Sequence, residues 1–498
     1  MNHAQDKQSK TASKEQLSSI YDDMGESISF WYPALQKSIV LYNFLSTSDI
    51  EFDNKALLKD VVRINYQVLY THLDIATIFR AELKADTPWG KRAHLKYIYH
   101  VLFEAVKALF GFDEKKQSLW VKFCNKSQGL LEKSEIDRVD KSIECFKTQY
   151  FSETEIRNYG ETNIREFRNY VAHYDYNPIE LYDFWISISE PKEVGIICNY
   201  LSISSDVCHL IDIVLNKITP GIVKDSKVNP VYLDSSIWER INYIPDTDGK
   251  LLKAIKTSVA TCVASLDGMM KDYRIPLKFE AEWGKDAITP LMHRLLESIH
   301  PLLFLHFIYI DIGCSIMAYL TSEHYLEKQL NLRHLNVIVY EGFNKIYGCE
   351  NVKRKENKNE EDQQLPYWQG LLYPTIMERG NDEWKEIARR IEGQLQQIAM
   401  DPLINNNTLR HMSVHILDKR NKDFVPCFYD KLIGMNPIIE MSKALKLFGA
   451  MNSIMWLNKE IINIHCSKIK DVQDKELDRI KRSFEEICLS IIQKSINE

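Results

Sequence analysis

Glycine and proline are scarce in this sequence of 498 residues, which contains 18 and 15 of them. Short alternating runs of β-branched residues joined by hairpin turns are also few. Because such runs and turns mark a β-rich chain, their scarcity argues against an all-β fold. We therefore predict a mainly α protein, and the length suits two or three domains that each bury a core.

The ten cysteines include no Cys-x2-Cys pair and follow no regular spacing. This pattern argues against a zinc ribbon, a thioredoxin-type site and a disulfide framework. A conventional cluster of metal ligands is missing too, as are a P-loop and a dinucleotide-binding fingerprint. We therefore expect no metal and no cofactor, and a reducing cytoplasmic environment.

The chain also lacks an excess of positive charge and a clear membrane signal. Its formal net charge is -6, so any contact with nucleic acid must use a local basic patch. Residues 1–16 are polar and predict a disordered tail, because a signal peptide needs an apolar segment. The apolar run Pro301–Leu320 is long enough for a membrane span, but it contains His306 and Asp311, which favours a buried core helix.

Apolar residues recur at spacings of three and four along much of the chain, which is typical of amphipathic helices. One such face contains Ile98, Val101, Leu102, Ala105, Val106 and Leu109. Another contains Ile438, Met441, Leu445 and Phe448.

An internal repeat is the most informative feature of the sequence. Two helical segments match without a gap when one is shifted by 237 positions along the sequence. This displacement is here called the repeat shift. It matches Asp74 with Asp311, Ile75 with Ile312, Leu83 with Leu320, Leu95 with Leu332, Glu104 with Glu341 and Gly111 with Gly348. The two glycines each follow an apolar helix, where a C-terminal cap belongs. We interpret the repeat as two diverged copies of one helical domain.

The domain boundaries follow from this repeat. We predict a disordered tail over 1–16, a first helical domain over 17–218, a linker over 219–250 and a second helical domain over 251–498. The linker region is rich in proline and glycine and has poor helical periodicity. The charged run at 351–364 is expected to be a solvated insertion, with a binding segment as the alternative.

Two motifs place an arginine five residues before a histidine. They read Arg168-Asn-Tyr-Val-Ala-His173 and Arg410-His-Met-Ser-Val-His415. One such motif arises by chance about once in two chains of this composition, so the significance lies in their equivalent places after the repeated helices. The alternative is that each histidine caps or packs a helix while each arginine pairs with a carboxylate.

The two motifs resemble the signature of the HEPN superfamily, in which an arginine, a polar residue, three further residues and a histidine lie on a late helix. Asn169 and His411 fit the polar second position of this signature. Many HEPN proteins are metal-independent endoribonucleases whose site forms where two domains meet. The resemblance therefore implies two tandem HEPN-like bundles and one composite site of Arg168, His173, Arg410 and His415. Some members carry a modified tyrosine two residues after the histidine, where this chain has Asp175 and Leu417.

These residue types suit RNA cleavage. Histidine can take the proton of the 2′-hydroxyl and protonate the 5′-oxygen near neutral pH. A guanidinium can stabilise the negative charge that gathers at phosphorus. Glu104 and Glu341 are expected to support the site by orienting the motif residues, or else they are unrelated acids that the repeat retained.

The sequence thus predicts a cytoplasmic endoribonuclease, and the resemblance adds the role of a bacterial defence or toxin-like effector. Its expected partners are an RNA substrate such as tRNA and an inhibitory or triggering protein, with no membrane; homo-oligomer formation stays open. The alternative is a non-catalytic helical scaffold that binds RNA or a nucleotide or holds the two halves together.

Overall fold

The computed structural model describes residues 14–111, 118–150, 178–187, 190–221, 249–283, 290–348, 366–400 and 434–463, together with 475 and 482. These residues form helices, turns and bends, and the described part of the chain contains no strand. The expectation of a mainly α fold is therefore confirmed.

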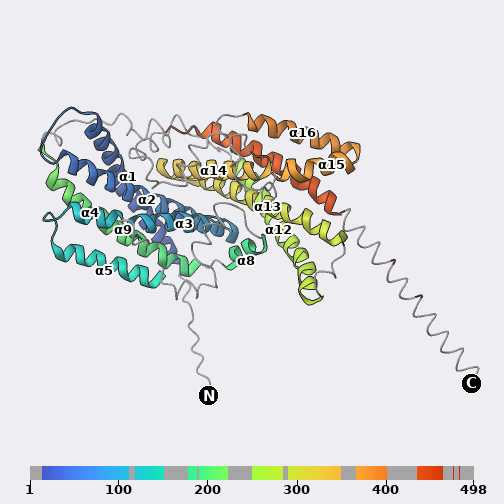
Figure 1. Cartoon of the computed structure of the whole chain (residues 1–498), viewed down its shortest axis with the longest axis horizontal. Helices are drawn as coiled ribbons and strands as arrows, with labels where there is room; N and C mark the ends of the chain where they lie inside the picture. Colours follow the sequence, from blue (N-terminus) through green and yellow to red (C-terminus); the bar gives the residue numbers. More distant parts are fainter. Residues whose placement is uncertain are drawn as a thin grey trace, which may run out of the picture. The chain divides into compact units, whose positions relative to one another are not determined.

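The helices follow one another in the order shown in Figure 1. They are α1 (Lys14–Thr47), α2 (Lys55–Lys84), α3 (Pro88–Leu109), α4 (Leu119–Lys126), α5 (Lys133–Tyr150), α8 (Pro178–Ser187), α9 (Glu190–Ile218), α12 (Lys250–Trp283), α13 (Pro290–Thr321), α14 (Tyr325–Ile346), the π-helical turn η4 (Trp368–Leu372), α15 (Tyr373–Arg379) and α16 (Asp382–Ala399). A further helix covers residues 437–463.

Two compact units divide the chain, and they alternate along it. Unit 1 comprises Met1–Ser258, Asp311–Glu341 and Pro402–Ala444. Unit 2 comprises Val259–Ile310, Gly342–Asp401 and Leu445–Glu498. The division into helical domains at 17–218 and 251–498, with a linker at 219–250, stays a prediction.

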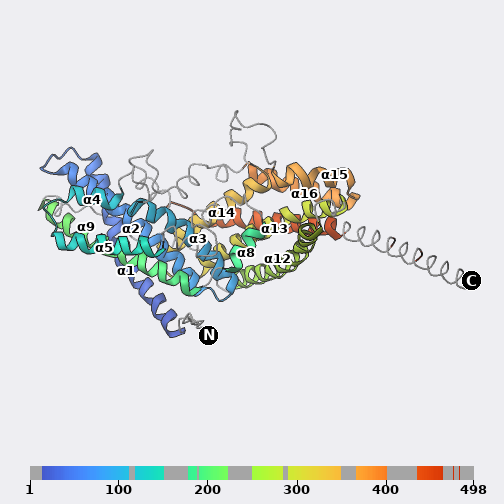
Figure 2. The ribbon, with the colours of Figure 1, turned by 60° about the horizontal axis from the view of Figure 1, so that its bottom comes forward.

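Helix α2 forms the centre of unit 1. It packs against α1, α3 and α9, and Figures 1 and 2 show α1, α2 and α3 running side by side. Its buried side chains include Leu58, Leu69 and Phe79, and also the polar His72 and Asp74. A helix that is buried on most of its faces must satisfy such polar groups internally, which makes their partners important for the site.

The bounds of two helices keep the spacing of the sequence repeat. α3 and α14 each have 22 residues, and the repeat shift carries Pro88, where α3 begins, onto Tyr325, where α14 begins. Gly111 and Gly348 end these helices with φ of 76° and 88°. Each donates its N–H to the carbonyl five positions earlier, over 3.2 and 3.3 Å, as a glycine cap does. The predicted caps are confirmed.

Among the described residues, two helical stretches are long and apolar enough to cross a membrane, Val194–Ile218 and Ile299–Thr321. The second is 89% buried inside the protein, as expected for a core helix. Within it, His306 donates from Nδ1 to the carbonyl of Leu302 over 2.7 Å and faces the Ser265 hydroxyl with Nε2 over 3.2 Å.

Helices α13 and α14 approach closely in unit 2 at Gly342. A Cβ placed on this glycine would lie 2.5 Å from Cγ2 of Ile308, closer than a carbon contact allows. We expect Gly342→Ala to lower the free energy of unfolding by about 1–3 kcal/mol, the usual cost of overpacking. Chemical denaturation measures the change.

Gly268 provides the control for this prediction. It lies in α12, is exposed, and has no atom within 4 Å of an added Cβ. Gly268→Ala should stabilise the protein by about 0.5–1 kcal/mol, because alanine favours the helix. Equal effects of the two substitutions would contradict the close approach at Gly342.

Candidate functional site

The six motif residues lie outside the described residues. Arg168, Asn169 and His173 fall in the segment 151–177, and Arg410, His411 and His415 fall in 401–433. Their roles, and their meeting in one site, stay predictions.

The two supporting glutamates are described. Glu104 lies on α3 and Glu341 on α14, each at the seventeenth position of its helix. Glu341 is buried and Glu104 is partly buried, so neither is an ordinary surface acid. Their predicted role in orienting the motifs stays open.

A buried ion pair joins α2 to α14. One terminal nitrogen of the Arg333 guanidinium donates to both carboxylate oxygens of Asp74, at 2.6 and 2.7 Å. The other terminal nitrogen donates to the hydroxyl of Tyr70, one turn earlier on α2. Asp74 is 0% exposed and Arg333 1%, so water screens neither charge. Arg333 therefore holds the pKa of Asp74 below its ordinary value despite the desolvation that raises it.

A second buried ion pair mirrors the first. The ammonium of Lys96 on α3 donates to Asp311 on α13, and both side chains are almost fully buried. The repeat shift carries Asp74 onto Asp311 and Lys96 onto Arg333. Each aspartate thus pairs with the basic residue that belongs to the other repeat.

The next residues along α3 and α14 also contact each other. The repeat shift carries Tyr97 onto His334, and their rings stack with centroids 5.6 Å apart and planes 13° from parallel. His334 also lies 3.4 Å from Asp74 through Nε2. Burial and the positive charge of Arg333 lower the pKa of His334, and burial lowers the pKa of His94 to about 4. Both imidazoles are therefore neutral at pH 7.

This buried cluster positions helices and is closed to substrate. Its charges lie opposite counter-charges, and its members are buried in the core of unit 1. Asp74 and Asp311 were visible in the repeat, but their partners Lys96 and Arg333 were missed. The signal was present, because these two residues are both basic and are matched by the same repeat shift.

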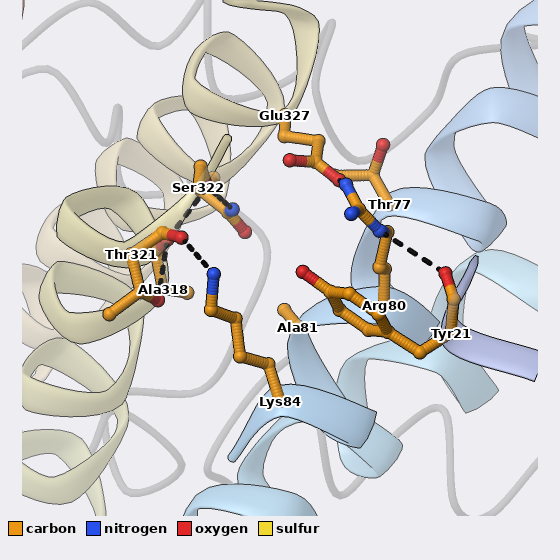
Figure 3. Close-up of a pocket in the computed structure, with 10 residues that line it drawn as sticks. Tyr21, Thr77, Arg80, Ala81, Lys84, Ala318, Thr321, Ser322 and Glu327 are labelled. Carbon is orange, nitrogen blue, oxygen red and sulfur yellow. Dashed lines mark hydrogen bonds and ion pairs between the residues drawn. The ribbon is translucent and has the colours of Figure 1, made fainter. Parts of the chain in front are cut away.

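A second polar cluster lies at the C-terminal end of α2, where it meets α1 and the turn between α13 and α14 (Figure 3). The guanidinium of Arg80 contacts Glu327 at 2.5 Å and Glu323 at 2.7 Å. It also lies 4.2 Å from the ring centroid of Tyr21. Gly25 makes room for it, because a Cβ there would lie 3.1 Å from the guanidinium carbon.

The turns that follow α2 and α13 each make a further contact with another helix. Tyr21 of α1 donates its hydroxyl to Glu323 over 2.9 Å, in the turn between α13 and α14. Lys256 of α12 pairs with Asp86, in the turn between α2 and α3. The repeat shift carries Asp86 onto Glu323 but Tyr21 onto Ser258, so these two contacts do not exchange residue for residue as the buried pairs do.

In the described part of the chain, no group of three or more His, Cys, Asp and Glu side chains has the geometry to hold a metal ion. The acidic side chains described above are instead engaged with lysine, arginine and tyrosine donors.

The buried pair of Asp74 and Arg333 predicts a large loss of stability when one charge is removed, and its recovery when both are removed. Asp74→Ala should cost about 3–5 kcal/mol of stability, because it leaves Arg333 buried without a counter-charge. Asp74→Leu combined with Arg333→Met should recover most of this loss, since neither charge then needs burial. Urea denaturation of the single and double variants measures the coupling.

Glu51→Ala is the matched control, because it removes an exposed partner of Lys55 and should cost at most about 1 kcal/mol. A double variant as unstable as Asp74→Ala would refute the buried pair.

The buried His72 predicts acid sensitivity. Its Nδ1 lies 2.8 Å from Ser204, whose hydroxyl donates to Leu201, and its Nε2 lies 2.9 Å from Ser27. Burial lowers its pKa to about 4. The unfolded chain, with a histidine pKa near 6.5, therefore binds more protons between about pH 4 and pH 6.5. His72 alone should therefore lower the stability by about 1 kcal/mol per pH unit across this window as the pH is lowered.

Urea unfolding between pH 7 and pH 5 tests this slope. His72→Gln should make it shallower, because glutamine has no proton to gain. Parallel pH dependences of the wild type and His72→Gln would contradict the prediction.

The resemblance to HEPN proteins was drawn from the two Arg-x4-His motifs and the repeated helices of this chain. No family model, no curated protein and no solved structure matches the sequence or the fold.

Proposed function

We propose that the chain is a metal-independent endoribonuclease built from two diverged copies of one HEPN-like helical domain. The copies correspond to 17–218 and 251–498, joined by the linker 219–250. Arg168 and His173 from the first copy and Arg410 and His415 from the second form one composite site. Asn169, His411, Glu104 and Glu341 support it.

The observation that carries this proposal is the reciprocity of the buried contacts. Asp74 pairs with Arg333 while Asp311 pairs with Lys96, and the four residues exchange under the repeat shift. Contacts in which residue i meets j and j meets i are the property of a two-fold interface between like subunits. Two copies within one chain, facing each other through α2–α3 and α13–α14, produce this pattern.

The contact between Tyr97 and His334 also supports a two-fold relation between the copies. On a two-fold axis, a residue meets its own equivalent. Tyr97 and His334 are equivalent under the repeat shift, and their rings stack. A composite site needs such pairing of two domains, because each contributes only half of the Arg and His groups.

The chemistry then follows from the residue types. One imidazole takes the proton of the 2′-hydroxyl, which attacks the neighbouring phosphorus, and the other protonates the departing 5′-oxygen. The guanidiniums stabilise the negative charge of the transition state. The products are a 2′,3′-cyclic phosphate and a 5′-hydroxyl, and no metal-activated water takes part.

The cellular role comes from the resemblance alone. A defence or toxin-like effector in the cytoplasm would act on RNA such as tRNA and would need an inhibitory or triggering protein partner. A homo-oligomer would not be required for a site that one chain completes.

A non-catalytic scaffold is the second candidate. The motif contexts differ between the copies, with Glu-Phe before Arg168 and Asn-Asn-Thr-Leu before Arg410. The reciprocal ion pairs would hold the copies together whether or not the motifs cleave RNA. In this candidate the motifs bind RNA or a nucleotide.

Cleavage of total RNA and labelled tRNA by the purified chain distinguishes the two candidates. We expect cleavage to persist in EDTA and to leave 2′,3′-cyclic phosphate ends, while a substrate without the 2′-hydroxyl at the scissile position resists. His173→Ala and His415→Ala should each lower the rate by roughly 10²–10⁴-fold, the usual contribution of general acid–base catalysis.

His209→Ala serves as the control, because it replaces an exposed histidine of α9 that belongs to neither motif. Circular dichroism verifies that each variant folds. Full activity in the double variant of His173 and His415 would reject the composite site, and loss from only one of them would make the other copy structural.

A further inference from the structure

An aromatic ring is exposed on the outer face of α1 in unit 1. Phe30 is 62% exposed, and its ring meets that of the buried Trp31 edge-on, with centroids 4.7 Å apart. Trp31 also contacts the ring of His209 on α9 at 4.9 Å, which holds the two helices together here. Ile213 is exposed one turn further along α9. The Phe30 ring is therefore supported from below, so a partner can pack on it without first ordering it.

The charged side chains around this ring are carboxylates. Between residues 16 and 36 of α1, and between residues 194 and 216 of α9, the sequence has no lysine or arginine. The charged residues of these stretches are Asp22, Asp23, Glu26, Asp206 and Asp212. The ion pairs among the described residues include none of them. Their negative charge is thus left without a counter-charge in the described part of unit 1.

Helical spacing brings several of these carboxylates close to the exposed apolar side chains. Glu26 and Asp23 precede Phe30 by about one and two turns, on the same face of α1. On α9, Asp212 directly precedes the exposed isoleucine and accepts a hydrogen bond from the neutral Asn216 over 3.2 Å. The exposed ring therefore lies in a negative field that attracts a cationic partner.

A proline adds a backbone acceptor beside the ring. Pro33 lies inside α1 and has no N–H. The carbonyl of Ser29, four residues earlier, therefore lacks its usual α-helical donor. Ser29 is exposed and directly precedes Phe30. This carbonyl can accept a hydrogen bond from a group that is bound on the ring.

These features together suit arginine. The face of an aromatic ring attracts a guanidinium, and carboxylates accept paired hydrogen bonds from it. Arginine and aromatic residues are also enriched together at protein interfaces, where lysine is depleted. RNA and anionic lipid surfaces are repelled by the same carboxylates. So is a second copy of this chain, whose formal net charge is -6.

We propose that this face of α1 and α9 is a docking surface for an arginine-rich segment of a partner protein. An arginine of the partner stacks on the aromatic ring, and its neighbours pair with the carboxylates of both helices. The proposal rests neither on the Arg-x4-His motifs nor on the proposed cleavage of RNA. The docking surface comprises Asp23, Glu26, Phe30, Asp212 and Ile213.

Fluorescence anisotropy of a labelled helical peptide with one arginine in each turn, titrated with the full chain, tests the proposal. Phe30→Ala should weaken binding roughly tenfold, because it removes the ring on which a guanidinium stacks. Phe30→Tyr should retain the affinity, since the ring remains. Glu26→Gln should weaken binding, because it removes a charged acceptor. The same peptide with glutamate in place of arginine should not bind.

Trp456→Ala and Glu386→Gln are the matched controls, because they remove an exposed ring and an exposed carboxylate from unit 2. Neither should change the affinity, and circular dichroism verifies that every variant folds. Unchanged affinity in Phe30→Ala would overturn the assignment. Equal losses from Glu26→Gln and Glu386→Gln would overturn it too, since they would indicate attraction by the overall charge. So would no binding of the arginine peptide at all.

Discussion

The buried ion pair of Asp74 and Arg333 is the constraint on which the arrangement of unit 1 depends. The two residues are 259 positions apart, yet each is almost fully buried. Removing two charges from water costs several kcal/mol per ion, and only close pairing with further hydrogen bonds compensates. α14 must therefore pack on α2 in one register, in which Arg333 reaches both Asp74 and Tyr70. A slip of one helical turn would leave both charges buried without partners.

The second pair, Lys96 with Asp311, applies the same constraint from the other side. The first pair fixes the register of α14 on α2, and the second fixes the register of α3 on α13. Both pairs must form at once, so only one register satisfies them. They are not identical, since Arg333 offers a planar fork that also reaches Tyr70, whereas Lys96 is a point charge. In the proposed two-copy arrangement this difference makes the pairing of unlike copies specific, as buried polar groups do in some helical assemblies.

The buried histidines of unit 1 differ from those that the proposed chemistry needs. RNA cleavage would need imidazoles whose protonation changes near neutral pH, so the deeply buried His72 and His94, with pKa values of about 4, do not suit it. The buried histidines and ion pairs instead hold the helices of unit 1 in place.

The sequence by itself determined the helical class and the glycine caps at Gly111 and Gly348. These are local signals, since periodicity and left-handed backbone depend on neighbouring residues. The sequence also identified Asp74 and Asp311 as a repeated pair. Only the tertiary structure assigned them Arg333 and Lys96, because a buried charge takes its partner from whichever helix packs against it. The pairing of Arg80 with Glu327 could not be predicted from the sequence for the same reason, because it forms only where α2 packs against the turn before α14.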